Sequence, residues 1–322
     1  MLESEVLLSV KNLKKHFPIR KGVLNRVKGA VKAVDGITFD VYKGETLGIV
    51  GESGCGKSTT GRLIIGLQEA TEGEVWYQDR DILQLKRNKM KEVRRSVQMI
   101  FQDPYSSLNP KWTIEKIISE PIDNYLKKTK LEKSNLIDEL LETVGMDKSV
   151  KYRYPHEFSG GQRQRIGIAR ALALNPEVLI ADEPVSALDV SIQGQVLNLL
   201  SDLQKDFSLT YIFVSHDLTV IDHFCDRVLV MYLGKVVEIS KKEDLYNNPL
   251  HPYTQALLSA IPSHEEKKER IILKGDVPSP SNIPSGCPFH TRCPVAMEKC
   301  KDIVPKLRDI ATEQKVACHL YN

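Results

Sequence analysis

The chain has 322 residues, which is enough for one large domain or two ordinary domains that each bury a core. Its 45 Lys and Arg residues nearly balance its 42 Asp and Glu residues, and the resulting net charge of +3 does not indicate nucleic-acid binding. No apolar run has membrane-spanning length, and the opening MLESEVLLSV lacks the order of a signal peptide, so we expect a cytoplasmic protein.

The first part of the chain, residues 6–50, alternates apolar and polar residues in short pieces. This alternation predicts antiparallel strands. Residues 20–32 interrupt the pattern because they are basic and punctuated by glycine. We expect them to form a solvated insertion, although a lysine-rich loop can also meet lipid headgroups or a neighbouring chain.

A glycine-rich loop, GESGCGKSTT at residues 51–60, follows an apolar run and precedes a helical segment. Glycine lets backbone N–H groups turn inward around an anion, and a helix amino terminus attracts phosphate. The stretch matches G-x-x-x-x-G-K-[ST], the phosphate-binding P-loop, in its strand, loop and helix setting. Lys57 adds a positive charge, and the Ser58 hydroxyl is placed to hold Mg²⁺. The predicted nucleotide-binding residues here are Gly51, Ser53, Gly54, Cys55, Gly56, Lys57, Ser58 and Thr59.

Helical periodicity marks residues 103–175 and predicts a helical insert. Two apolar stretches follow, at 177–182 and 210–216, with a helical stretch at 190–207 between them. This rhythm predicts a βαβ unit in a parallel sheet that is covered on both faces.

Two adjacent acids, Asp182 and Glu183, end the first of these strands. Parallel sheets place their active sites at the carboxyl ends of strands. We therefore expect Asp182 to hold Mg²⁺, directly or through water, and Glu183 to polarise an attacking water. Two acids at a strand end can also be an ordinary solvated cap.

A second possible phosphate-binding helix terminus is FSGGQ at residues 158–162. Ser159, Gly160 and Gly161 begin an arginine-bearing helix there. Taken alone, these residues are equally consistent with an ordinary helix cap.

Beyond residue 245 the pattern weakens. Residues 251–262 predict a short helix, residues 263–270 are a charged run typical of a solvated face, and residues 277–286 are a Pro/Ser linker. Four of the six cysteines follow, and in a cytosolic protein such a cluster indicates metal before disulfide. These are Cys287, Cys293, Cys300 and Cys318.

The cysteine spacing, C-x5-C-x6-C-x17-C, lacks the C-x2-C pairs of a zinc ribbon. Four thiolates can hold an iron–sulfur cluster, and proline follows both Cys287 and Cys293, as it follows cysteine in ferredoxin runs. Zinc and no metal at all remain alternatives, and His290 or His319 could substitute for a cysteine ligand.

Six motifs, in order, resemble those of the nucleotide-binding subunits of ABC transporters. They are Walker A at 51–58, Gln102 in IFQDP, the signature at 158–162, Walker B at 179–184, SALD at 186–189 and His216 in VSHD. The resemblance spans roughly residues 5–245. It implies an α/β P-loop NTPase with a RecA-like parallel-sheet core, an antiparallel β subdomain and a helical subdomain at about 103–175.

The resemblance also implies a mechanism. Two such domains close head to tail, and each ATP lies between the P-loop of one and the signature of the other, contacted there by Ser159, Gly160, Gly161 and Gln162. Glu183, His216 and Gln102 would be catalytic, and Gln102 would join Ser58 and Asp182 around Mg²⁺. Asp189 would carry signals across the dimer interface. Phe17 would stack on adenine, although a core phenylalanine fits its position nearly as well.

The last part of the chain, from NNPLHPYTQALLSAIP to VACHL, is similar to the carboxyl extension of ATPases from oligopeptide and dipeptide importers. The similarity implies a nucleotide-binding domain at 1–245 and a small cysteine-rich extension at 246–322. Some relatives carry a 4Fe-4S cluster on these cysteines, which favours that cluster over zinc. Nickel importers share a related extension, so a nickel or metal-chelate importer is an alternative.

The partners that this likeness implies are a second, homologous ATPase in a heterodimer, two transmembrane permease subunits and an extracytoplasmic peptide-binding protein, with no nucleic acid. The chain would lie peripherally on the cytoplasmic face of the cell membrane. A non-transport ABC ATPase acting on nucleic acid or ribosomes is a weaker alternative, because the chain has one cassette and no strong basic surface signal.

Overall fold

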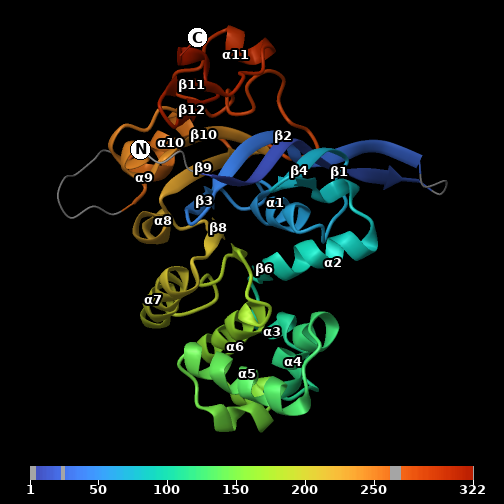
Figure 1. The fold of residues 1–322 in the computed structure, drawn as a ribbon. Coiled ribbons are helices and arrows are strands. Elements are labelled where there is room, and N and C mark those ends of the chain that lie inside the picture. Colours follow the sequence, from blue (N-terminus) through green and yellow to red (C-terminus); the bar gives the residue numbers. More distant parts are fainter. Residues whose placement is uncertain (1–4, 23–25, 262–269, 322) are drawn as a thin grey trace. The chain divides into compact units, whose positions relative to one another are not determined.

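The computed structural model describes residues 5–22, 26–261 and 270–321 (Figure 1). The chain divides into two compact units. The first unit contains residues 84–214 with the short stretch 42–45, and the second contains residues 6–41, 46–83 and 215 onward. Each unit is described by itself.

Three parallel strands form the sheet of the first unit. β7 (Val178–Asp182) lies between β6 (Val97–Ile100) and β8 (Thr210–Val214). Ile100 is opposite Ala181, and Asp182 is opposite Val214, so the strands end at one edge. Every residue of β7 and β8 is buried, and α7 (Val190–Phe207) joins them. This confirms the predicted βαβ unit and explains its continuous apolar strands.

Helices occupy most of residues 103–175, as the periodicity predicts. They are α3 (Pro104–Ser107), α4 (Ile114–Tyr125), α5 (Lys130–Thr143) and α6 (Gly160–Leu172), with 3₁₀ turns at Lys148–Tyr152 and Pro155–Glu157. In α4, Ile114, Ile117, Ile118 and Ile122 recur at helical spacing and are all buried. The first unit also contains α2 (Arg87–Ser96), directly before β6.

The second unit contains an antiparallel sheet with strand order β2, β1, β4, β5. Its strands are β1 (Val6–Lys21), β2 (Arg26–Tyr42), β4 (Glu72–Tyr77) and β5 (Arg80–Asp81), and the 3₁₀ turn Ile82–Gln84 follows. In the basic stretch 20–32, residues 20–21 belong to β1 and residues 26–32 to β2, Gly22 is a turn residue, and residues 23–25 lie outside the described residues. Residues 26–29 are exposed, in agreement with the expected solvation.

Five further strands of this unit lie side by side in the order β11, β12, β10, β9, β3. β3 (Thr46–Val50) pairs in parallel with β9 (Arg227–Tyr232), and β9 pairs antiparallel with β10 (Lys235–Lys241). Two helices of this unit are α1 (Lys57–Ile64), which begins directly after the glycine-rich loop, and α8 (Leu218–Phe224).

The carboxyl part of the chain continues this sheet. β12 (Gln314–Val316) pairs with both β10 and β11 (Arg308–Ala311), which the sequence reasoning missed. The predicted helix at 251–262 is α10 (Pro252–Ser259), which follows α9 (Lys242–Asn247). The short elements α11 (Lys299–Asp302) and the 3₁₀ turn His319–Tyr321 complete the segment.

The charged run expected at 263–270 lies outside the described residues except for Arg270. The linker at 277–286 contains no helix or strand, as its proline content predicts. Among the described helices, none combines the length and apolar character needed to cross a bilayer.

Candidate functional site

The P-loop connects a buried strand to a helix in the second unit. β3 ends at Val50, and α1 begins at Lys57. The Lys57 side chain is only 4% exposed, and its Nζ donates to the carbonyl oxygens of Gly51 at 2.8 Å and of Glu52 at 3.2 Å. Ser58 and Thr59 lie in the first turn of α1, where helical N–H groups lack partners within the helix. The loop therefore combines a lysine side chain with the amino terminus of a helix, and both features favour a phosphate.

Two glycines of the loop are required by close backbone contacts. Gly51 has a φ of 151°, and a Cβ on it would lie 2.2 Å from the carbonyl oxygen of Met231. Gly56 has a φ of 105°, and its Cβ would lie 2.1 Å from the carbonyl oxygen of Ala33. A side chain at either position would displace the loop from β2 or β9.

The other predicted residues of the loop have different surroundings. Cys55 is buried, and burial raises the pKa of its thiol. The carbonyl of Cys55 accepts from the N–H of Gly234 at 2.9 Å, which holds the loop to the turn between β9 and β10. Ser53 and Gly54 are more exposed, and a Cβ on Gly54 would meet open space.

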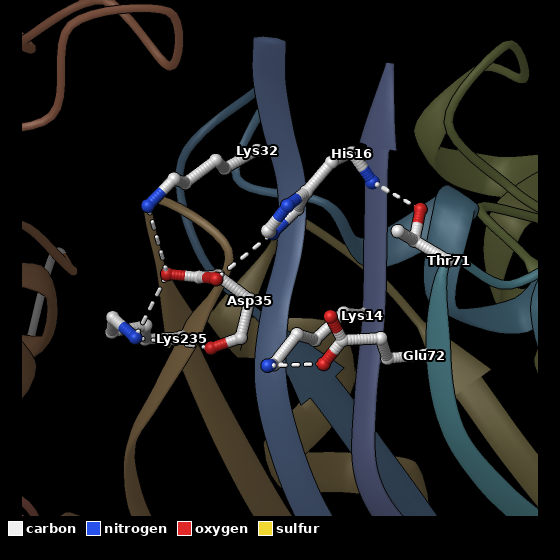
Figure 2. A network of polar contacts seen from close by, with 7 residues as sticks. All are labelled: Lys14, His16, Lys32, Asp35, Thr71, Glu72 and Lys235. Carbon is white, nitrogen blue, oxygen red and sulfur yellow. Dashed lines mark hydrogen bonds and ion pairs between the residues drawn. The ribbon is translucent and has the colours of Figure 1, made fainter. Parts of the chain in front are cut away.

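A network of polar and charged side chains surrounds Asp35 of β2 (Figure 2). The Asp35 carboxylate is 2.9 Å from His16 Nε2, 3.0 Å from Lys235 Nζ and 3.9 Å from Lys32 Nζ. Burial alone would raise the pKa of Asp35, but Lys235, His16 and Lys32 outweigh it and hold the pKa below its usual value. The network ties together β1, β2 and β10, and Ala33 of the same β2 stretch contacts Gly56.

Phe17, the predicted adenine-stacking residue, lies on β1 next to His16. Its side chain is 37% exposed, and Lys15 Nζ lies 5.0 Å from the centre of its ring. The ring is therefore partly exposed and does not belong to the buried core.

The predicted catalytic acids lie at the carboxyl edge of the sheet in the first unit. Asp182 is the last residue of β7 and is 0% exposed. Glu183 follows with a left-handed backbone, φ 45°, and its N–H donates to the Val214 carbonyl at 3.0 Å. Gln102, two residues beyond β6, donates its Nε2 hydrogen to Glu183 Oε2 at 2.8 Å. The structure thus brings Gln102 and Glu183 together.

His216 lies two residues beyond the end of β8 and is exposed. It sits between Ser215, whose Oγ accepts from the Asp217 N–H at 3.0 Å, and Asp217, which caps α8. This turn fixes the backbone on both sides of the histidine.

The signature residues form a helix cap. Ser159 caps α6, and its Oγ accepts from the Gln162 N–H at 3.3 Å while Gln162 Oε1 accepts from the Ser159 N–H at 3.0 Å. A Cβ on Gly161 would lie 2.4 Å from Cγ2 of Ile192 in α7, whereas Gly160 has more room. Ser159 and Gln162 therefore cap α6, and the nucleotide contact expected of these residues stays a prediction.

Asp189 is also a helix cap. Its Oδ1 accepts from the Ile192 N–H at 3.0 Å and from the Ser191 hydroxyl at 2.8 Å. Hydrogen bonds from Ser191 and then Ile192 hold the pKa of Asp189 below its usual value, so the residue is a carboxylate.

The four cysteines of the carboxyl segment are free thiols that line one small cavity together with His251, Phe289 and His290. Burial raises the pKa of Cys287 to about 11, and it also raises the pKa of Cys293 and of Cys318. Within the described ranges, no group of three or more His, Cys, Asp or Glu side chains is arranged to hold a metal ion. The four cysteines therefore line one cavity without forming such a group.

The two candidate substitute ligands have other contacts. His290 Nδ1 lies 2.9 Å from the Cys287 carbonyl oxygen, and His319 Nε2 lies 2.8 Å from the Ile303 carbonyl oxygen.

Glu52 is a residue that sequence reasoning missed. It occupies one of the variable positions of the P-loop motif, so the motif itself gives no signal. In the structure it forms an ion pair with Arg292, which is 240 residues away in sequence.

A glycine-rich loop between a parallel strand and a helix, together with acids at the carboxyl end of a buried parallel strand, defines a P-loop nucleotide-hydrolysing protein. Two family models match the chain: "ABC transporter" over residues 34–186 and "Oligopeptide/dipeptide transporter, C-terminal region" over residues 237–300.

Curated relatives match over nearly the whole chain. The oligopeptide transport ATP-binding protein AppF of Bacillus subtilis (strain 168) is 57% identical over 99% of this chain and 98% of its own length. A putative oligopeptide transport ATP-binding protein of the same strain, YkfD, is 54% identical over 98% of this chain and 95% of its own length.

Among solved structures, the ATP-binding cassette MJ0796 in a dimeric post-hydrolysis state bound to ADP and Pi has a TM-score of 0.65 and 28% identity. The match covers 73% of this chain and 98% of that one. The chain belongs to the ATP-binding subunits of the oligopeptide and dipeptide ABC transporter family, and the expected ABC ATPase fold is confirmed.

Proposed function

We propose that this protein is the ATP-hydrolysing subunit that drives import of dipeptides or oligopeptides across the cytoplasmic membrane. The observation that carries the proposal is the 57% identity, over 99% of the chain, to a protein named as an oligopeptide transport ATP-binding protein. The carboxyl-region family match supports a peptide cargo rather than another ABC substrate.

The residues of the P-loop supply the chemistry for ATP binding. Lys57 and the N–H groups of Gly54 to Thr59 would contact the phosphates, and Phe17 would stack on the adenine. Lys57 donates to the loop carbonyls of Gly51 and Glu52, and a triphosphate would offer it stronger, charged acceptors.

Mg²⁺ would be held by Ser58, Asp182 and Gln102, whose hydroxyl, carboxylate and amide oxygens form the oxygen donor set that this ion prefers. Gln102 uses an N–H on Glu183, which leaves its carbonyl oxygen as the atom suited to a metal. When bound, the ion would neutralise phosphate charge.

Glu183 and His216 would carry out the hydrolytic step. Glu183 would accept a hydrogen bond from the attacking water, and Gln102 would orient its carboxylate. His216 would contact the γ-phosphate. In a closed dimer, the α6 terminus of one subunit, with Ser159 to Gln162, would complete the partner's ATP site, and Asp189 would lie toward the interface.

The proposed assembly contains a second, homologous ATPase, two permease subunits and an extracytoplasmic peptide-binding protein. The chain would lie peripherally at the cytoplasmic face of the membrane. We assign residues 1–245 to the nucleotide-binding domain and residues 246–322 to the importer extension.

Peptide uptake tests the function. Cells lacking the protein should lose uptake of a labelled tripeptide, the intact gene should restore it, and the Glu183→Gln variant should not. Nickel uptake measured in the same cells serves as the control. Normal tripeptide uptake together with lost nickel uptake would replace the proposal with a metal importer.

We further propose that Cys287, Cys293, Cys300 and Cys318 bind a 4Fe-4S cluster, with zinc as the alternative. The support is that all four line one cavity and that thiolates are the usual ligands of such clusters. Binding would require the thiols to lose their protons and their sulfur atoms to move toward a common centre.

Anaerobic expression followed by iron, zinc and acid-labile sulfide analysis tests this second proposal. About four irons and four sulfides per chain, with broad absorption near roughly 400 nm, are expected. One zinc without sulfide would favour the alternative, and no metal would overturn both.

A further inference from the structure

The segment between Cys287 and Cys293 forms a salt bridge with the P-loop. Arg292 Nη1 donates to Glu52 Oε2 at 2.8 Å, and Nη2 donates to Glu52 Oε1 at 3.1 Å. The Arg292 side chain is 8% exposed and that of Glu52 is 27% exposed. A two-pronged contact this shielded from water is stronger and more directional than a surface pair.

Aromatic rings hold Arg292 in place. Its Nη1 lies 3.4 Å from the hydroxyl of Tyr232, and the guanidinium carbon lies 5.9 Å from the centre of that ring. Phe289, one turn before Arg292, packs its ring 5.3 Å from the ring of Tyr232 and 5.4 Å from that of Tyr253. Tyr232 therefore holds the guanidinium group of Arg292, and the packing of Phe289 holds the turn that precedes it.

A second part of the chain, α10, holds the backbone of Glu52. The N–H of Glu52 donates to the hydroxyl of Tyr253 at 2.9 Å. The carbonyl of Glu52 accepts from Lys57, the residue whose ammonium group suits a phosphate. Arg292 thus holds the side chain of Glu52, and Tyr253 holds its N–H. The carbonyl oxygen of Glu52 contacts Lys57.

The negative charge of Glu52 affects how the loop binds an anionic ligand. Glu52 places a carboxylate in a loop whose proposed ligand is strongly anionic, and a carboxylate without a partner would repel phosphate. Arg292 neutralises that charge. It also orders the first turn of the loop before a ligand arrives, which lowers the entropy cost of binding.

We propose that Arg292 is a positioning residue for nucleotide binding, which neutralises Glu52 and holds the first turn of the P-loop from the carboxyl segment. The inference rests on the proposed assignment of this loop to ATP. It gives the carboxyl extension a direct effect on the ATP site.

The test compares ATP and ADP affinity, by calorimetry on the full chain, for wild type, Arg292→Ala, Arg292→Lys, Glu52→Gln and the Arg292→Ala/Glu52→Gln double variant. Arg292→Ala should weaken binding about tenfold. Arg292→Lys should weaken it less, because one charge remains but the two-pronged contact is lost. The double variant should bind better than Arg292→Ala, because the repelling carboxylate is gone.

Lys301→Ala is the matched control. Lys301 lies in the same carboxyl segment, but its side chain is exposed and pairs with Glu298. Its affinity should equal that of wild type. Amide hydrogen exchange in residues 51–56 of the nucleotide-free chain should be faster in Arg292→Ala than in Lys301→Ala.

A merely structural role predicts different results. If Arg292→Ala lowered affinity and Glu52→Gln did not improve it in the double variant, neutralisation would be excluded, and unchanged affinity in both Arg292 variants would overturn the inference outright. If Arg292→Ala does not fold, the nucleotide affinities of Arg292→Lys and of the Arg292→Lys/Glu52→Gln double variant provide the same comparison. Wild-type protein that bound no ATP would instead refute the proposed function.

Discussion

Glu183 has a left-handed backbone, φ 45°, which costs a residue with a side chain about 1–3 kcal/mol. Several contacts hold it there. Its N–H donates to Val214, its carbonyl accepts from the Ser186 hydroxyl at 3.1 Å and from the Ser186 N–H at 3.2 Å, and its carboxylate accepts from Gln102. Such conformations persist where the surrounding structure over-determines them, and they cluster at functional sites. The backbone therefore directs this carboxylate away from the line of the strand.

Replacing Glu183 by Gln should separate binding from turnover. The amide keeps the size of the side chain but cannot accept a proton, so ATP affinity should be unchanged while ATP hydrolysis falls by roughly two to four orders of magnitude. Steady-state hydrolysis by the assembled transporter and ATP binding by the full chain measure the two effects. Near-normal hydrolysis would exclude Glu183 as the base.

Lys57→Ala provides the contrasting variant. It removes the buried ammonium group that lies in the loop, so nucleotide affinity itself should fall. A variant with normal affinity and lost turnover would show that Lys57 acts only in the chemical step.

His251 should make the stability of the protein depend on pH. It is 1% exposed, its Nδ1 accepts from the Tyr253 N–H at 3.0 Å, and burial lowers its pKa to about 3. The unfolded chain binds this proton near pH 6.5. Between about pH 6.5 and pH 3 the unfolded state therefore holds more protons, and this histidine reduces the free energy of unfolding by up to about 1.4 kcal/mol per pH unit as the pH falls.

The His251→Asn variant isolates this effect, because asparagine can cap α10 but does not titrate. Glu238, which accepts from the N–H of Leu250 and of His251, has its pKa raised by burial and acts in the opposite direction in both proteins. Urea unfolding at pH 7 and pH 5 should show that the free energy of unfolding decreases less in the variant than in wild type when the pH is lowered. Equal losses would contradict the prediction.

At the scale of elements, the packing of α6 against α7 depends on a glycine. The Cβ of an alanine at Gly161 would lie 2.4 Å from Ile192 Cγ2, closer than atoms can approach. The signature glycine therefore has a packing reason in addition to any contact with a nucleotide. Ser159 and Asp189, the caps of α6 and α7, lie at the amino termini of these same helices.

Gly161→Ala should destabilise the protein by about 1–3 kcal/mol, because the helices must separate or the isoleucine must leave its rotamer. Thermal melting without nucleotide measures this. Gly194→Ala, at an exposed position of α7, is the matched control. A Cβ there meets nothing within 4 Å, and alanine stabilises a helix by roughly 0.5–1 kcal/mol relative to glycine. A Gly161→Ala protein as stable as Gly194→Ala would refute the packing argument.

For the molecule as a whole, the carboxyl segment is integral to the second unit. β12 pairs with β10, with Glu238 opposite Val316, and Phe289 is buried against the rings of Tyr232, Tyr253 and His251. The segment therefore contributes both a strand and a core side chain to the unit that carries the P-loop.

Phe289→Ala should lower the free energy of unfolding by about 3–5 kcal/mol, the usual cost of removing a fully buried phenylalanine. Denaturant unfolding measures it. Leu320→Ala, in the same segment and 47% exposed, should change stability by less than about 0.5 kcal/mol. Equal and small effects would mean that the segment folds apart from the rest of the unit.

Short-range patterns allowed much of this structure to be predicted from sequence. The P-loop, the buried strands β7 and β8, helix α7 and the helices of 103–175 depend on periodicity and on residues adjacent in the chain. The strand ends at Gln102 and Glu183 could be expected together because parallel strands end at one edge.

Contacts between distant segments became known only with the folded structure. The pairing of β10 with β12, the size limit that Ile192 sets on Gly161 and the Arg292–Glu52 salt bridge all depend on partners far away in sequence. Local patterns carry no information about such partners, because long-range pairing is settled by the packing of the whole core. Residues adjacent in the chain were thus enough to predict a nucleotide-binding loop, whereas the residues that hold the loop follow from the packing of distant segments.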